Sequence, residues 1–454
     1  MDQDRPCRRR RRHRRQSCED YISGLPDELL HSILLRLGSA RAAARTSVLS
    51  RRWRPVWTYL PELVFGNDDT LPPPAPASFL DAVDGALAAY AAPTLEALIV
   101  IVPTAGNNGI NVLARRVVAP WLRFAAERVV GEVVLLVPAL RTSLYKPWPE
   151  VDRKEVVLEL PACERAKAIA LRLKHHWRLR LRPAGSEVTA LVCTRCPCLR
   201  NLRLYITLVH ASDISIRSGS LRSLSFCVRK TRRLEVVAPR LENLFLGDNI
   251  DAARFSAPKL ERLVWNSGFY DPQRHRFDDI GRRLWLLDVD GCFILAQLMR
   301  RFDEVDEFKL GISIPGGNGA YKIFLDETNM MPKCKILRIA LRWNKHGLAP
   351  VMLHLLRNCR STKKLSIQLV DYCGYSSYLC WSYCPCRLEE SRRAKGVALN
   401  SLEEVEITSH KSSQEELLEF VEQLLPRCNA AVLKKLVINY TTFFPLARTK
   451  VRFF

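Results

Sequence analysis

Apolar residues near the start of the chain recur at the spacing of a helix. Between Leu25 and Leu37, leucine or isoleucine returns every three to four residues, which places these side chains along one side of a helix. Pro26 suits a first helical turn, and the two acidic residues after it complement the positive end of the helix dipole. Gly38 follows the last apolar position. The pattern therefore predicts a helix that ends before Gly38.

Two further short helices are expected directly after this one. The first covers Ala42–Leu49, and the second begins near Ser50, which can cap it. Trp53 and Trp57 lie four residues apart and so share a helix face, while Pro55 removes one backbone donor between them. Three short helices bury too little apolar surface to form a stable domain by themselves. We expect this helical head to pack on a partner or on the rest of its own chain.

Beyond the head, the pattern changes to alternating strands and helices. Residues 66–78 contain four prolines without apolar periodicity and are predicted to be a linker. Strands are then expected at "LEALIVIV", "GEVVLLVP", "VVLELP" and "AIALRL", with helical segments in "NVLARRVVAPWLRFAAERV". This alternation indicates an α/β protein.

From about residue 190, leucines recur as L-x-x-L-x-(apolar). The successive copies start at intervals of 22, 20 and 19 residues and comprise Leu199, Leu202 and Leu204; Leu221, Leu224 and Phe226; Leu241, Leu244 and Leu246; and Leu260, Leu263 and Trp265. A period of about 20 to 29 residues with this pattern is typical of leucine-rich repeats, which stack into a solenoid. The alternative is an ordinary α/β sheet in which the spacing is coincidental.

Later copies are longer and leave room for helices. They are recognised by Leu337 and Ile339; Leu365 and Ile367; Leu402, Val405 and Ile407; and Leu433, Leu436 and Ile438. The segment Ser413–Leu425 between the last two copies has a helical pattern. We therefore predict a curved solenoid of mostly parallel strands with helical returns.

Composition narrows the class of protein. The chain has 454 residues, 48% of them hydrophobic, and a mean hydropathy of −0.08, which is typical of a folded soluble protein. No window holds the roughly 18 uncharged apolar residues that a membrane span requires. The arginine-rich N-terminus has no apolar run behind it, so we expect no secretory signal and no membrane association. An intracellular protein of the nucleus, the cytoplasm or both is expected.

The net charge of +23 raises the question of whether the protein binds nucleic acid. Much of this charge lies in one block, which cannot fold alone and is predicted to be a disordered tail. It is either a nuclear localisation signal, a weak phosphate binder or a solvated tail. No array of aromatic and basic residues suited to base stacking follows it, so nucleic acid is not the expected partner. The arginines of the candidate localisation signal are Arg8, Arg9, Arg10, Arg11, Arg12, Arg14 and Arg15.

Candidate chemistry is sparse. Fifteen cysteines in an intracellular chain should be reduced, and most are expected to be small core residues. Two clusters have metal-ligand residue types, but neither supplies the second nearby pair of ligands that a structural zinc site needs, so packing is the expected role. These clusters are Cys193, Cys196 and Cys198, and Cys380, Cys384 and Cys386.

No catalytic motif was found. The run "PGGNGA" at Pro315–Ala320 lacks the Gly-Lys-Ser/Thr ending of a phosphate-binding loop, and neither Gly-x-Ser-x-Gly nor His-Glu-x-x-His occurs. We expect a protein without catalytic residues, cofactor or metal.

The head resembles the F-box of plant F-box proteins in three ordered blocks. They read "LPDELLHSIL", "TSVLSRRWRPVW" and "PELVF", against a family pattern of roughly LPDxLLxxIL, TSVLSxRWRxxW and PxLxF. Gly38 stands where the family commonly has proline. The rest is similar to the leucine-rich-repeat arm of the same family, and its end, from "TKKLSIQL" to "LKKLVI", is similar to the FBD motif.

The resemblance implies a division into segments. These are 1–19, a disordered tail; 20–65, the F-box; 66–78, the linker; 79–360, the repeat arm; 361–440, FBD-like repeats; and 441–454, a C-terminal tail.

The resemblance also implies a function. An F-box docks on a Skp-type adaptor of a cullin-RING ubiquitin ligase, and the repeat arm recruits a protein substrate. Expected adaptor contacts, each of which could equally be core, are Leu25, Pro26, Leu29, Leu30, Ile33, Val48, Leu49, Trp53 and Trp57. Arg51, Arg52 and Arg54 would form a polar rim that steers an acidic adaptor. The alternative is a basic nuclear repeat protein that binds nucleic acid or protein without a ligase role.

Overall fold

The computed structural model describes most of the chain outside its N-terminal tail. The described residues are 24–66, 76–102, 120–137, 162–173, 178–179, 196–291, 296–344, 346–357, 360–370, 383–387, 398–410, 414–441 and 448–453. The predicted arginine tail, the candidate localisation signal, Cys193, Cys380 and the predicted strand "VVLELP" lie outside them.

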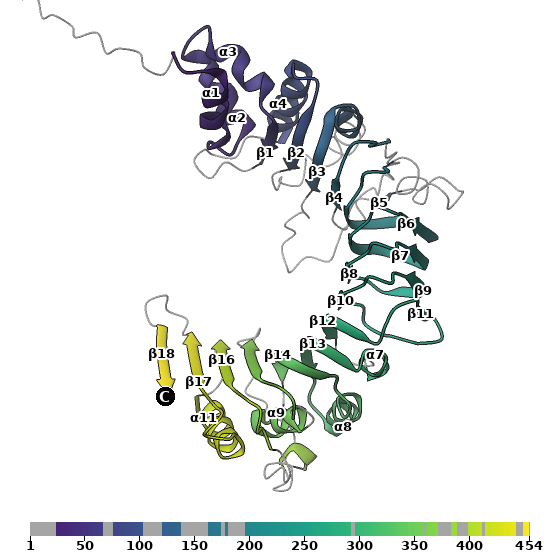
Figure 1. The fold of residues 1–454 in the computed structure, drawn as a ribbon, viewed down its shortest axis with the longest axis vertical. Coiled ribbons are helices and arrows are strands. Elements are labelled where there is room, and N and C mark those ends of the chain that lie inside the picture. Colours follow the sequence, from purple (N-terminus) through teal and green to yellow (C-terminus); the bar gives the residue numbers. More distant parts are fainter. Residues whose placement is uncertain are drawn as a thin grey trace, which may run out of the picture.

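The molecule is a crescent that begins with a helical head and continues as a long arm (Figure 1). The head contains α1 (Asp27–Leu35), α2 (Ala40–Arg45), η1 (Thr46–Val48), α3 (Trp53–Val56) and η2 (Trp57–Tyr59). The labelled helices of the arm are α4 (Pro76–Ala89), α7 (Ala296–Arg301), α8 (Asn318–Glu327), α9 (Leu348–Leu356), η3 (Pro385–Arg387), α11 (Gln414–Leu424) and η4 (Leu425–Arg427). Residues 120–128, in one of the predicted helical segments, are also helical. None of the described helices is long and apolar enough to cross a membrane.

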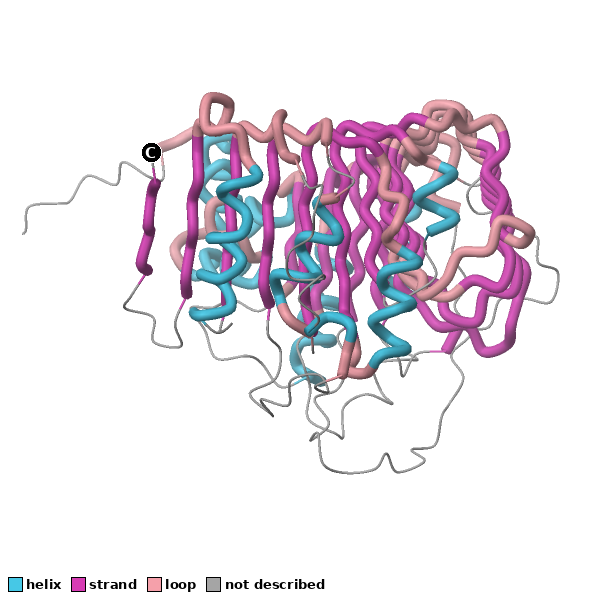
Figure 2. Tube along the Cα trace, turned by 90° about the horizontal axis from the view of Figure 1, so that it is seen from below, coloured by secondary structure: helices cyan, strands magenta, loops and turns pink. Residues whose placement is uncertain are grey.

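Strands line the inner side of the crescent and helices lie outside them (Figures 1 and 2). Those before residue 250 are β1 (Glu62–Phe65), β2 (Leu95–Ile101), β3 (Val129–Val137), β4 (Ala168–Leu173), β5 (Arg178–Leu179), β6 (Asn201–Arg217), β7 (Ser223–Val237) and β8 (Asn243–Leu246). Those after it are β9 (Ile250–Ser256), β10 (Arg262–Trp265), β11 (His275–Asp278), β12 (Arg283–Gly291), β13 (Glu304–Ile314), β14 (Lys333–Asn344), β15 (Lys364–Val370), β16 (Glu404–His410), β17 (Lys435–Thr441) and β18 (Arg448–Phe453).

The strand pairing aligns one buried residue of each repeat with the next. The aligned series is Leu63, Leu98, Val133, Ile169, Leu202, Leu224, Leu244, Leu263, Leu287, Phe308, Leu337, Leu365, Val405 and Leu436. Every member is at most 4% exposed. These pairings are all parallel, and only the last described pair, β17 with β18, is antiparallel. The predicted solenoid of mostly parallel strands is therefore confirmed.

Two strands of this series, β12 and β13, were not predicted from the sequence. Leu284, Leu287 and Val289 of β12 fit the L-x-x-L-x-(apolar) pattern, whereas β13 has Phe308 in place of the second leucine. β18 extends the sheet within the segment predicted to be a C-terminal tail. Helix α4 begins at Pro76 and so takes in the end of the predicted linker, because proline is favoured in a first helical turn.

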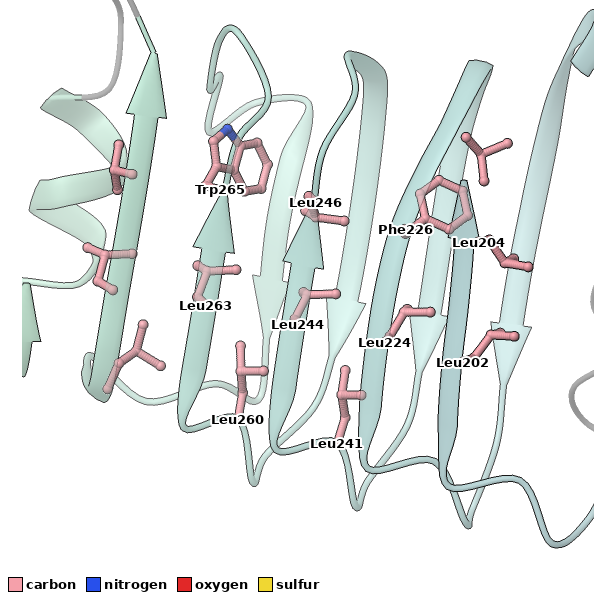
Figure 3. Close-up of a cluster of buried hydrophobic side chains, with 14 of the residues drawn as sticks. Leu202, Leu204, Leu224, Phe226, Leu241, Leu244, Leu246, Leu260, Leu263 and Trp265 are labelled. Carbon is pink, nitrogen blue, oxygen red and sulfur yellow. The ribbon is translucent and has the colours of Figure 1, made fainter. Parts of the chain in front are cut away.

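The middle of the arm has two layers of strands in place of a strand and a helix. β6 and β7 are long enough to turn from the inner to the outer side, and their pairing register shifts between Thr207 and Asp213. Their second halves continue the outer layer through β9 and β11. Figure 3 shows the aligned leucines, Phe226 and Trp265 pointing into the space between these layers. Short repeats of about 20 residues are thus closed by strands because they have no room for a helix.

The head is joined to the arm by the sheet itself. β1 pairs in parallel with β2, from Glu62 opposite Ala97 to Phe65 opposite Val100. The Tyr90 hydroxyl, after α4, donates to the Leu60 carbonyl at 2.8 Å. The end of the F-box pattern is therefore also the first strand of the solenoid, which the sequence did not predict.

One half-buried histidine of α9, which packs against α8, makes stability depend on pH. His354 Nε2 lies 3.1 Å from Thr328 Oγ1, and the ring packs edge-on against Phe324. Burial lowers the pKa of His354 to about 4, and the charge of Arg357 acts in the same direction. The unfolded chain, with a histidine pKa of about 6.5, takes up this proton first as the pH falls.

The free energy of unfolding should therefore decrease as the pH falls from about 6.5 towards 4, with His354 contributing at most about 1.4 kcal/mol per pH unit. Urea unfolding between pH 7 and pH 5 measures this slope. His354→Gln should flatten it, whereas His210→Gln, at an exposed position, should not. An unchanged slope in His354→Gln would contradict the prediction.

Candidate protein-binding site on the helical head

The head has a small core of its own. Leu30 and Leu34 on α1 are at most 1% exposed, and Trp53 and Val56 on α3 are each 4% exposed. His31 Nε2 lies 3.1 Å from the Val56 carbonyl and so links α1 to the end of α3. The three helices predicted from the sequence are present, and the second and third are shorter and end in 3-10 turns.

The turn between α1 and α2 depends on a glycine. Gly38 has φ +64°, in the left-handed region that favours glycine. Ser39 then caps α2, since its Oγ accepts a hydrogen bond from the Ala42 amide at 3.4 Å. Proline, with φ fixed near −65°, cannot adopt this conformation. The departure from the family pattern at Gly38 therefore has a structural reason in this chain.

Gly38→Ala should lower the free energy of unfolding by about 1–2 kcal/mol, the cost of placing an L side chain in the left-handed region. Gly85→Ala is the matched control. Gly85 is exposed within α4, its added Cβ would meet nothing within 4 Å, and its backbone is helical. That substitution should raise the free energy of unfolding by up to about 1 kcal/mol. Chemical denaturation measures both, and the same sign for both would contradict the assignment.

A second apolar set on the head is exposed. Leu29 and Ile33 on α1 are 49% and 40% exposed, and Leu37, one turn further, is 44% exposed. Val48 and Leu49, at the end of η1, are 87% and 67% exposed. Exposed leucines are common singly, but a group of them on one small unit marks an interaction surface. We call these five residues the apolar face of the head.

Arg52 connects the two parts of the apolar face. Its guanidinium donates to the Leu25 carbonyl and, at 2.9 Å, to Asp27 Oδ1 at the start of α1. The turn that carries Leu49 is thereby held against the N-terminus of α1. The ion pair is exposed and contributes little to stability by itself. Arg51 and Arg54 are also exposed and surround this region with positive charge.

The structure divides the predicted contact residues into three groups. Leu30 and Trp53 lie in the core of the head and support its surface. Leu25 and Trp57 are half-buried and pack against that core. The exposed ones are Pro26, Leu29, Ile33, Val48 and Leu49. Leu37 was missed as a surface residue, although its spacing of eight residues from Leu29 places it on the same side of the helix.

The concave side of the arm carries a row of charged residues. Asp288, Lys309 and Arg338 lie opposite one another on β12, β13 and β14. Glu307 accepts from Arg338 at 2.7 Å and lies 3.6 Å from Lys309. Burial raises the pKa of Asp288, against the attraction of Lys309. Tyr270 is buried and packs edge-on against Trp265, so it is part of the core and not of this surface.

Among the described residues, metal-ligand side chains converge at His346, Cys384 and Cys386. In the other cysteine cluster, the two described members, Cys196 and Cys198, do not form such a group. Cys196 is buried beside Cys163, whose pKa is raised by the hydrogen bond between the two thiols and by burial, while Cys198 is exposed.

Comparison with known proteins identifies the head. The F-box domain model matches residues 22–64. An F-box/FBD/LRR-repeat protein of Arabidopsis thaliana is 45% identical over 87 residues, 18% of either chain. An FBD-associated F-box protein of the same plant is 28% identical over 209 residues, 41% of either chain, so these matches cover less than half of the relatives' length. A further Arabidopsis F-box protein is 28% identical over 373 residues, 78% of this chain and 85% of the relative.

Proposed function

We propose that this F-box protein with a leucine-rich-repeat arm is the substrate-recognition subunit of an SCF-type (Skp-cullin-F-box) ubiquitin ligase. The head binds a Skp-type adaptor and, through it, the cullin-RING ligase. The arm holds a protein target for ubiquitylation. The chain has no catalytic step of its own in this proposal and acts in the nucleus, the cytoplasm or both.

The observation that carries the proposal is the apolar face of the head. Its five residues are between 40% and 87% exposed although the head already has a closed core in Leu30, Leu34 and Trp53. Desolvating such side chains against a partner stabilises a complex by about 25 cal/mol per Å² of apolar surface. The exposed Arg51 and Arg54 beside it suit an acidic partner, for which they would raise the association rate.

The charged inner side of the arm supports the second half of the proposal. Asp288, Lys309 and Arg338 place one acidic and two basic side chains on three adjacent strands, and the acidic Glu307 lies beside the two basic ones. A curved surface of this kind offers a long concave face for another protein. Mixed charge favours a protein target over the uniformly negative backbone of a nucleic acid.

The proposal is tested by co-expressing the full chain with several Skp-type adaptors and measuring co-purification by size-exclusion chromatography. We expect an equimolar complex with at least one adaptor. Deleting Arg8–Arg15 should leave this capture intact. A folded chain that captures none of them would overturn the ligase role and favour the basic nuclear repeat protein. Loss of nucleic-acid binding in the deletion variant would then support that alternative.

A further inference from the structure

Three buried side chains from two distant segments of the arm meet at one point. His346 precedes α9 and is 2% exposed, while Cys384 and Cys386 flank Pro385 in η3 and are at most 1% exposed. The histidine nitrogen and both sulfur atoms lie within 4.8 Å of one another. The Nδ1–Sγ distances are 3.5 Å to Cys384 and 3.4 Å to Cys386. Imidazole and thiolate are the preferred ligands of zinc in proteins.

The histidine is oriented for a ligand at Nδ1. Its Nε2 lies 2.8 Å from the Pro315 carbonyl, a group that can only accept, so Nε2 carries the hydrogen and Nδ1 carries the lone pair. The Tyr321 ring of α8 packs against the imidazole at 4.8 Å between centroids and fixes its plane. A backbone carbonyl on the second ring nitrogen is the usual support of a metal-binding histidine. The nitrogen lone pair thus points to the place where the two sulfur atoms converge.

The two distances from the histidine nitrogen to the sulfur atoms suit a tetrahedral ion. With zinc–sulfur bonds of about 2.3 Å and zinc–nitrogen bonds of about 2.0–2.1 Å, neighbouring nitrogen and sulfur ligands stand about 3.6 Å apart. The two observed Nδ1–Sγ distances, 3.4 and 3.5 Å, agree with this value. We propose that His346, Cys384 and Cys386 bind one Zn²⁺ ion. Binding displaces the two thiol protons, and the fourth position is left to water or another donor.

The site would have a structural role. Cys384, Cys386 and η3 belong to the connection between β15 and β16 and pair with no described strand. η3 packs against both α8 and α9. The ion would therefore join the repeat of His346 to the segment of the two cysteines. The hydrogen bond from His346 to the Pro315 carbonyl would connect it to the preceding repeat as well. This inference is independent of the proposed ligase role, because the site lies in the arm and the apolar face lies on the head.

The test uses the full chain, purified without chelators from zinc-supplemented cells. Elemental analysis should give about one zinc per chain, as for a single site. Cys384→Ser, Cys386→Ser should lose this zinc. The matched control is Cys163→Ser, Cys196→Ser, which removes another buried pair of neighbouring cysteines and should retain it.

X-ray absorption of the parent chain keeps the test decisive if a variant fails to fold. It should show two sulfur ligands at about 2.3 Å and at least one nitrogen at about 2.0–2.1 Å. A zinc-free parent chain would overturn the proposal, as would zinc retained in Cys384→Ser, Cys386→Ser or a coordination shell without sulfur. A disulfide between Cys384 and Cys386, seen as a mass loss of two hydrogens, would overturn it in favour of a redox pair.

Discussion

Replacing Trp265 with alanine should lower the free energy of unfolding by about 3–5 kcal/mol. Trp265 is 1% exposed and lies at the end of β10, between the two strand layers (Figure 3). Its ring meets Tyr270, His275 and Phe277 at centroid distances of 5.3 to 6.1 Å, and its Nε1 donates to the Phe269 carbonyl at 3.3 Å. Truncation would leave a cavity that these rings cannot close without losing their mutual packing.

Trp285 provides the matched control, because it lies on the neighbouring strand β12 and is 43% exposed. Its ring contacts the guanidinium of Arg262 at 4.3 Å, and such an exposed cation–π contact contributes about 0.5–1 kcal/mol. Trp285→Ala should therefore cost no more than about 1 kcal/mol. Equilibrium denaturation of both variants checks the difference. Equal losses would mean that the two-layer packing around Trp265 is wrong.

Leu29→Asp, Val48→Asp should abolish capture of a Skp-type adaptor while leaving the head folded. Both side chains are exposed, at 49% and 87%, so the charges remain in water in the isolated chain. In a complex they would be buried without a partner. Loss of two central apolar contacts weakens binding by about 100-fold or more. Titration of the adaptor measures the change, and the free energy of unfolding should stay within about 0.5 kcal/mol.

Two controls separate loss of surface from loss of fold. Leu418→Asp introduces a charge at an apolar residue that is 56% exposed, on α11 at the other end of the arm, and should leave capture unchanged. Trp53→Ala should reduce capture only by destabilising the head, by about 3–5 kcal/mol, because Trp53 is core. Undiminished capture by Leu29→Asp, Val48→Asp would place the adaptor contact elsewhere.

Much of the arm could be predicted because its repeats use leucine at fixed spacing. Leu202, Leu224, Leu244 and Leu263 were aligned by sequence alone and are paired in the structure. Phe308 was missed because a buried strand position accepts any large apolar residue, so the repeat continues without its leucine. The outer layer of β9 and β11 was missed because strand pairing between non-adjacent segments leaves no periodic pattern.

The candidate site shows where a helix pattern stops being informative. Leu29 and Leu30 are neighbours in an apolar run, yet one is 49% exposed and the other fully buried. Periodicity predicts that this segment is a helix. When apolar residues lie on two sides of that helix, however, periodicity does not show which side packs against the core. The same holds for the proposed zinc ligands, since His346 is 38 residues from Cys384 and only the stacking of repeats brings them together.

The pairing of β1 with β2 joins the head and the arm into one rigid unit. In the proposed SCF complex, a target bound at a given strand would therefore have a fixed position and orientation relative to the adaptor, because the junction between head and arm is a paired sheet and not a hinge. Adding or removing one repeat would move it by about 4.8 Å, one strand spacing, and turn it along the crescent. Lengthening the segment 67–75 would leave that pairing in place. In the proposed role, the number of repeats between the head and the bound target would thus set the distance over which ubiquitin is transferred. Which lysines of the target are modified would depend on where along the arm the target binds.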